Sequence, residues 1–134
     1  MIIDGKHAAM GRLSSTVAKE LLKGNDVIIV NAERVIITGS HASIKKKYLE
    51  QRRRGSPHHG PFFPKTPNLI LRRVIRGMLP YKKEKGRTAM KKLRIYIGFP
   101  SELQQQETVS LAKEVQSDFI TLAELSKVLG WKDR

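Results

Sequence analysis

The side chains with the greatest chemical potential are Lys and Arg residues crowded into one window of the sequence, residues 45–92. This window holds sixteen Lys or Arg and two acidic residues, Glu50 and Glu84, whereas the rest of the chain carries ten residues of each sign. The whole net charge of +14 therefore arises in the window. A surface this cationic repels itself and needs a polyanion, and nucleic acid is the usual one.

Two basic tripeptides open this window. Residues 45–47 and 52–54 are separated by about two helical turns. Three consecutive basic residues spread over most of the circumference of a helix, so their side chains can reach more than one phosphate strand. Such contacts hold a protein on a nucleic-acid backbone and carry little sequence information. The arginines farther along also suit phosphate, because a guanidinium fork can bind it through two hydrogen bonds.

The distribution of the cations favours RNA over DNA. They are spread over two expected helices, a proline-rich loop and a turn, rather than over one recognition helix with a helix-turn-helix partner. Such a shaped surface suits folded RNA, which proteins recognise through its shape and its 2′-hydroxyl groups. A sequence-tolerant DNA-binding protein remains the alternative of the same class.

Other chemistry has little support. Adjacent His58 and His59 have no Cys or carboxylate beside them, so they indicate hydrogen bonds to phosphate or sugar, and we expect no metal site. Gly5 and Gly11 bracket a strand-to-helix loop, yet neither G-x-x-x-x-G-K-[ST] nor G-x-G-x-x-G is present. No acid–base pair or nucleophile elbow stands out. We expect neither an enzyme nor a cofactor, and a nucleotide-utilising enzyme remains the rival hypothesis.

The composition predicts one globular domain spanning residues 1–134. The chain has no cysteine, so it has neither disulfides nor a Cys-based zinc site. Its first residues do not form a signal peptide, and its apolar runs are too short to cross a bilayer. We expect a soluble intracellular protein with no membrane partner and no small-molecule substrate.

Hydrophobic patterning predicts the elements that position the cations. Residues 1–3 and 27–30 are expected strands, and Leu13, Val17 and Leu21 predict a helix between them, ended by Gly24-Asn25. This βαβ unit favours a parallel sheet. A further β-branched strand is expected over residues 35–38.

The window itself should contain two main helices and a loop. A helix is expected over residues 42–53, followed by a proline-punctuated loop to Pro64. Thr66 and Pro67 open the next helix, which Pro80 ends. Its apolar stripe should be Leu71, Val74, Ile75 and Met78, with Arg72, Arg73 and Arg76 on the opposite face.

After this helix we expect a basic turn over residues 82–86, a short helix and a last strand over residues 94–97. Residues 104–118 predict a weakly ordered or helical surface segment. Thr121 and Glu124 make a capping box. The final helix should pack through Leu122, Leu125, Val128 and Leu129, end at Gly130 and dock through Trp131.

Residues 76–80 read RGMLP. This string and others, which together span about three-quarters of the chain, resemble in order and spacing one known family, large-subunit ribosomal protein thirteen. The loop at residues 60–64 resembles the archaeal and eukaryotic branch. The other matching positions are Asp4-Gly5, residues 11–15, 27–33 and 38–39, Lys82-Lys83, Gly86-Arg87, Ala89, residues 91–93, Tyr96, Gly98 and Pro100.

The resemblance implies an α/β fold, a three-layer α/β/α sandwich around a small, about four-stranded and mainly parallel sheet. A basic helix–loop–helix insertion and a C-terminal helix would complete it. It implies a non-catalytic, cytoplasmic constituent of the large ribosomal subunit that binds its ribosomal RNA, adjoins other ribosomal proteins and supports assembly. Gly77 would permit close backbone approach, and no function is carried onto residues 101–134.

Charge and resemblance together give the predicted RNA-binding residues. Arg12, outside the window, is expected to extend the same RNA-facing surface. The full set is Lys6, Arg12, Ser14, Ser15, Lys45, Lys46, Lys47, Arg52, Arg53, Arg54, His58, His59, Lys65, Arg72, Arg73, Arg76, Lys82, Lys83, Lys85, Arg87, Lys91 and Lys92.

Overall fold

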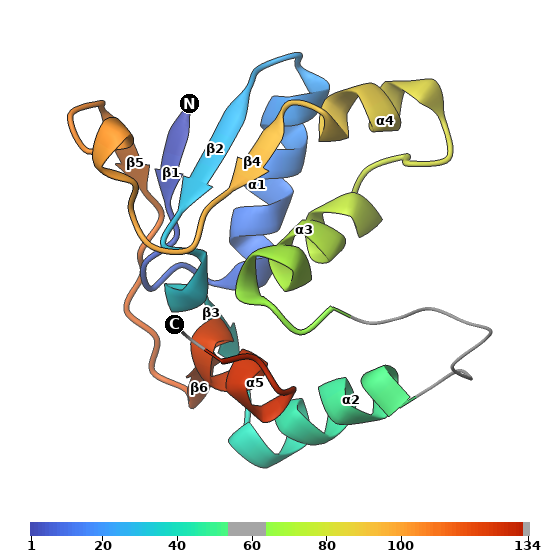
Figure 1. Ribbon diagram of the computed structural model, residues 1–134, viewed down its shortest axis with the longest axis vertical. Coiled ribbons are helices and arrows are strands. Elements are labelled where there is room, and N and C mark those ends of the chain that lie inside the picture. Colours follow the sequence, from blue (N-terminus) through green and yellow to red (C-terminus); the bar gives the residue numbers. More distant parts are fainter. Residues whose placement is uncertain (54–63, 133–134) are drawn as a thin grey trace.

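The strands of the described part of the chain form two separate sheets (Figure 1). The computed structural model describes residues 1–53 and 64–132. The larger sheet has four strands, all parallel, in the order β4-β2-β1-β5, and the smaller one pairs β3 with β6 in antiparallel fashion. The strands are β1 (Ile2–Asp4), β2 (Val27–Val30), β3 (Ile36–Thr38), β4 (Leu93–Ile95), β5 (Thr108–Ser110) and β6 (Phe119–Thr121).

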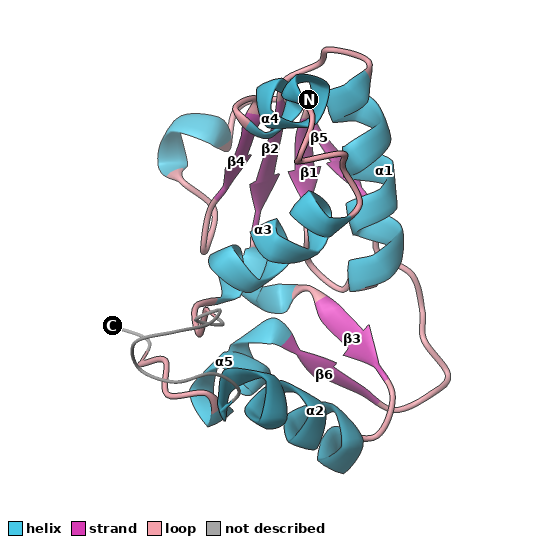
Figure 2. Ribbon diagram, turned by 90° about the vertical axis from the view of Figure 1, so that its right-hand side faces the viewer, coloured by secondary structure: helices cyan, strands magenta, loops and turns pink. Residues whose placement is uncertain are grey.

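Five α-helices within the described residues flank these strands. Helix α1 lies against one face of the parallel sheet with α3 and α4 packed beside it, and the short 3-10 helix η2 lies on the opposite side (Figure 2). The predicted α/β sandwich around a small parallel sheet is therefore confirmed. The helices are α1 (Met10–Leu22), η1 (Ala32–Arg34), α2 (His41–Arg53), α3 (Pro67–Gly77), α4 (Glu84–Met90), η2 (Ser101–Leu103) and α5 (Leu122–Val128).

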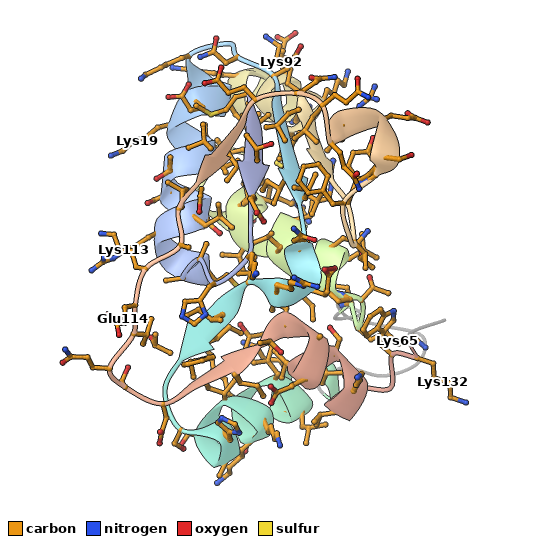
Figure 3. The ribbon with its side chains drawn as sticks, turned by 90° about the vertical axis from the view of Figure 1, so that its left-hand side faces the viewer. Lys19, Lys65, Lys92, Lys113, Glu114 and Lys132 are labelled. Carbon is orange, nitrogen blue, oxygen red and sulfur yellow. The ribbon has the colours of Figure 1, made fainter. Side chains whose placement is uncertain are left out.

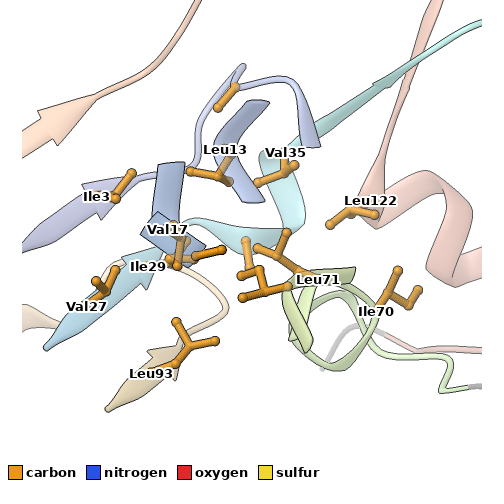
Figure 4. Close-up of a cluster of buried hydrophobic side chains, with 14 of the residues drawn as sticks. Ile3, Leu13, Val17, Val27, Ile29, Val35, Ile70, Leu71, Leu93 and Leu122 are labelled. Atoms are coloured by element: carbon orange, nitrogen blue, oxygen red, sulfur yellow. The ribbon is translucent and has the colours of Figure 1, made fainter. Parts of the chain in front are cut away.

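The core joins the inner face of the parallel sheet to the apolar faces of α1 and α3 (Figure 4). The predicted α1 stripe of Leu13, Val17 and Leu21 is buried, and it packs with Ile29 of β2 and Leu71 of α3. Burying one such side chain stabilises the fold by about 1.5–3 kcal/mol. The β1-α1-β2 unit is confirmed.

A polar network turns the chain away from the parallel sheet after β2. Asn31 adopts a left-handed conformation with φ of 56°, and its side-chain amide donates to Asp4 Oδ1 at 2.9 Å. The Gly98 amide donates to Glu33 Oε2 at 2.7 Å. Strand β3 forms where a strand was predicted, but it pairs with β6 instead of extending the parallel sheet.

Residues 104–118 are mostly irregular and exposed, in line with the predicted weakly ordered surface segment, but the prediction missed β5, which pairs with β1 in parallel register. The strand over residues 94–97 is also not the last one, since β5 and β6 follow it. Strand β5 has only three residues, and the single apolar one, Val109, is 41% exposed. Pairing with β1, rather than a hydrophobic pattern of its own, holds β5 in place.

Helix boundaries in the basic region also differ from the prediction. Helix α3 ends at Gly77, before Pro80, and α4 begins at Glu84 inside the expected turn. Met78 was expected in the α3 stripe, but it caps the helix end and is 44% exposed. The side chain of Thr66 makes no capping hydrogen bond, and its Oγ1 is buried without a partner among the described residues.

Helix α5 begins as predicted. The Glu124 amide donates to Thr121 Oγ1 at 3.2 Å, and Gly130 follows the helix with φ of +107°. Leu122, Leu125 and Leu129 are buried, whereas Val128 is 37% exposed, so the prediction that it packs in the stripe is wrong.

Removing the cap at Thr121 should destabilise the protein. We expect Thr121→Ala to lower the free energy of unfolding by about 1 kcal/mol, because the Glu124 amide loses its acceptor. Chemical denaturation measures this change. Thr88→Ala, on an exposed position inside α4, is the control and should leave stability unchanged within about 0.5 kcal/mol. An equal midpoint for both variants would contradict the capping role.

Candidate nucleic-acid interface

The cationic helices lie along one side of the molecule, with α2 at one end, α3 in the middle and α4 at the other end (Figures 1 and 2). The charge window therefore becomes an elongated surface and not a single compact patch. Each helix is anchored differently, and the anchoring decides which of its cations face outward.

Helix α3 separates its apolar and cationic residues onto opposite faces. Leu71 and Ile75 are buried, as predicted, while Arg76 is exposed and Arg72 and Arg73 are half-buried. The Arg72 guanidinium donates through Nη1 to the Leu93 carbonyl at 3.4 Å, which ties α3 to the start of β4. Arg76 is the most accessible guanidinium of the three.

The start of α4 is pressed against the turn that precedes it. A Cβ placed on Gly86 would lie 2.1 Å from the Pro80 carbonyl oxygen and 2.8 Å from the Tyr81 amide nitrogen. Arg87 then donates from Nη2 to the Lys82 carbonyl at 2.9 Å and from Nε to the Tyr81 carbonyl at 3.3 Å. These contacts fix the turn and the guanidinium of Arg87 relative to each other.

Between α3 and α4 lies a cavity of about 440 Å³, here named the α3–α4 cleft. The Arg76 guanidinium carbon stands 4.4 Å from the centre of the Tyr81 ring, so the two planar groups form a cation–π pair at the cleft. Among the described residues no carboxylate lines the cleft. Its lining is Arg72, Arg76, Tyr81, Arg87, Met90 and Lys91.

The opposite side of α4 faces the end of α1. Lys85 and Lys92 line a hollow there with Gly24, and Lys92 Nζ donates to the Gly24 carbonyl at 3.0 Å. Lys92 therefore binds the end of a helix of its own chain. Lys82 and Lys83, before α4, are exposed.

Helix α2 carries the first basic tripeptide. Ile44 and Tyr48 are buried and anchor the helix, while Lys46 and Lys47 are exposed and Lys45 is half-buried. Burial raises the pKa of the Tyr48 hydroxyl, so this group stays neutral beside the lysines.

Part of the predicted site lies beyond what the structure describes. This applies to the side chains of Arg52 and Arg53, to Arg54, His58 and His59, and to most of the proline-punctuated loop. Lys65, just after that loop, is described and exposed.

The RNA-binding residues predicted near the start of α1 do not line the α3–α4 cleft. Arg12 lines a different hollow, of about 950 Å³, together with Ser15 and residues 110–117. Lys6 and Ser15 are exposed, but Ser14 is fully buried, with no hydrogen-bond partner for its hydroxyl among the described residues. Because RNA cannot reach a buried hydroxyl, the prediction for Ser14 is wrong. Figure 3 shows this side of the molecule, with Lys19 and Lys113 pointing outward.

Two important positions were not identified from the sequence. Tyr81 pairs with Arg76 at the cleft. Gly86 lies close to the backbone of Pro80, whereas the sequence had indicated Gly77 as the glycine that permits a close backbone approach. A Cβ on Gly77 would meet nothing within 4 Å, so the chain's own packing does not require glycine there. The signal for Tyr81 was an aromatic residue that directly follows Pro80 and directly precedes two lysines.

Other kinds of site find no support in the described part of the chain. No group of three or more His, Cys, Asp or Glu side chains comes together there to hold a metal ion. None of the helices of residues 1–53 and 64–132 is both long and apolar enough to span a membrane.

Comparisons with known proteins agree over most of the chain. A family model described as Ribosomal protein L13 matches residues 1–102. Curated proteins described as large ribosomal subunit protein uL13 are similar over 98% of this chain. The one from Methanosarcina barkeri is 49% identical and that from Methanocaldococcus jannaschii 50% identical, each covered over 98% of its length. The one from Methanopyrus kandleri is 42% identical and covered over 87%.

Proposed function

Because the chain belongs to the ribosomal protein L13 family, we propose that it is a constituent of the large ribosomal subunit that binds large-subunit ribosomal RNA and supports assembly. This is a family of structural ribosomal proteins, and the chain is not an enzyme. Its place of action is then the ribosome in the cytoplasm, where other large-subunit proteins adjoin it.

The α3–α4 cleft supports the RNA-binding part of this proposal most directly. It gathers four cations and an aromatic ring on one accessible surface, and no described carboxylate lines it. Arg72 and Arg87 are held in place by backbone carbonyls and still keep N–H groups for other acceptors. Such oriented donors bind phosphate oxygens with little loss of side-chain entropy.

Neutralising the α3 arginines tests this proposal. We expect the Arg72→Gln, Arg73→Gln, Arg76→Gln variant to bind protein-free archaeal large-subunit ribosomal RNA at least about tenfold more weakly, because charge-assisted hydrogen bonds to phosphate are lost. Filter binding at fixed salt measures the affinity. Since Arg72 donates to Leu93, a small loss of thermal stability is also expected.

The matched control removes three positive charges elsewhere, by Lys19→Gln, Lys23→Gln and Lys127→Gln. These lysines are exposed on α1, just after α1 and on α5. The control should retain wild-type affinity within a factor of about two, since none of these three lysines lines the α3–α4 cleft. Equal weakening of both variants would contradict a defined interface, and preference for duplex DNA over ribosomal RNA would contradict the RNA proposal.

A further inference from the structure

The α3–α4 cleft contains more than a phosphate-binding surface requires. Phosphates need only exposed cations, yet this cavity of about 440 Å³ also presents the Tyr81 ring and the Met90 side chain. Its volume falls within the range of about 300–1,000 Å³ that is typical of small-ligand sites. The cleft therefore has the size and the mixed lining of a site for a compact ligand with a planar part and an anionic part.

The planar part of such a ligand could stack on the Tyr81–Arg76 pair. Tyr81 is 38% exposed, and the Arg76 guanidinium lies over its ring at 4.4 Å. Arg76 is itself exposed, so the pair is accessible from solvent. Unpaired bases of RNA stack on aromatic rings and on guanidinium planes, and a Tyr–Arg pair offers both.

The anionic part of such a ligand would meet N–H donors of the protein that are held in a fixed orientation. Arg87 uses two of its five N–H groups on the carbonyls of Tyr81 and Lys82, which leaves three for a ligand. Lys91, four residues after Arg87 at the C-cap of α4, is exposed and lines the same cavity. A phosphate at this end of the cleft would meet two cations and no described carboxylate.

We propose that the α3–α4 cleft receives one unpaired nucleotide of the bound RNA, with its base stacked on the Tyr81–Arg76 pair and its phosphate held by Arg87 and Lys91. This rests on the proposed RNA-binding function and goes further, because it names the feature of the RNA that the cleft selects. A paired base would first have to leave its stack, so a bulged or looped nucleotide binds at the lowest cost. A regular duplex would touch the same cations without entering the cleft.

The first test uses the full chain and small probes. Adenosine 5′-monophosphate, ribose 5-phosphate and inorganic phosphate are titrated at low salt against ¹⁵N-labelled protein, and NMR shifts of Tyr81, Arg87 and Lys91 are followed. We expect the nucleotide to bind about five- to a hundredfold more tightly than ribose 5-phosphate, the effect expected for stacking of one base. Equal affinities for the two would overturn the proposal.

Variants at Tyr81 separate stacking from charge. Tyr81→Phe keeps the ring and should keep the preference for the nucleotide, whereas Tyr81→Leu should abolish it while leaving phosphate binding unchanged. Since Tyr81 is partly exposed, both variants should fold, which their melting curves verify. A preference that survives in Tyr81→Leu would overturn the proposal.

A second measurement uses RNA. A hairpin carrying one bulged adenosine should bind more tightly than the same hairpin without it, and Tyr81→Leu should remove this difference. If neither hairpin is preferred although ribosomal RNA still binds, the nucleotide site is refuted and the proposed function stands. If the protein fails to bind ribosomal RNA at all, the proposed function itself is refuted.

Discussion

The affinity for ribosomal RNA should fall by about a thousandfold or more between 50 and 200 mM salt, as expected when about six to ten phosphates are contacted. Each neutralised phosphate releases condensed counterions, and that release becomes less favourable as salt rises. The exposed cations of the elongated surface supply enough contacts. Among them are Lys46, Lys47, Lys65, Arg76, Lys82, Lys83, Lys85, Arg87 and Lys91.

The measurement is the slope of log affinity against log salt concentration. The Arg72→Gln, Arg73→Gln, Arg76→Gln variant should reduce the magnitude of this slope by about three, roughly one for each lost phosphate contact. The Lys19→Gln, Lys23→Gln, Lys127→Gln control should keep the wild-type slope. A flat salt response of the wild-type protein would refute an electrostatic interface altogether.

Replacing Gly86 with alanine should destabilise the protein by about 2–3 kcal/mol, which corresponds to roughly 5–10 °C in melting temperature for a chain of this size. An alanine inside a helix is normally favoured over glycine by about 1 kcal/mol. At Gly86 the substitution should lower the stability instead of raising it. The new Cβ would lie 2.1 Å from the Pro80 carbonyl oxygen, and a backbone atom cannot rotate away as a side chain can. The α3–α4 cleft should widen as α4 moves.

Gly77→Ala is the matched control for this prediction. It changes the same residue type at the end of α3, where a new Cβ meets nothing within 4 Å. We expect unchanged stability or a gain of up to about 1 kcal/mol. Calorimetry of both variants measures the contrast. If Gly86→Ala melts at the wild-type temperature, the close approach of Gly86 to Pro80 does not constrain the fold.

The strongest local patterns of the sequence predicted the fold well. The α1 stripe and the unbroken apolar run of β2 each determine one element without outside information, and both were confirmed. The Thr121 cap and Gly130 likewise mark the ends of α5 through their own chemistry. Patterns fail where an element depends on a partner elsewhere in the chain, as β5 depends on β1.

The candidate site was predicted in composition but not in geometry. Counting charges identified the arginines of α3 and the cations of α4, because both helices are rich in them. It could not show that Lys92 binds Gly24 or that Ser14 points into the core, since both depend on how α1 packs. Nor could counting charges show the close approach of Gly86 to Pro80, which presses the start of α4 against the turn before it.

The position of β1 inside the parallel sheet has a consequence for how the chain is made. One neighbour of β1 is β2, which is synthesised soon after it, but the other is β5 at Thr108–Ser110. During vectorial synthesis the cationic helices therefore emerge while one edge of β1 still lacks its strand. An open strand edge is a template for pairing with another chain. The segment beyond the matched family region thus supplies the strand that covers this edge of β1.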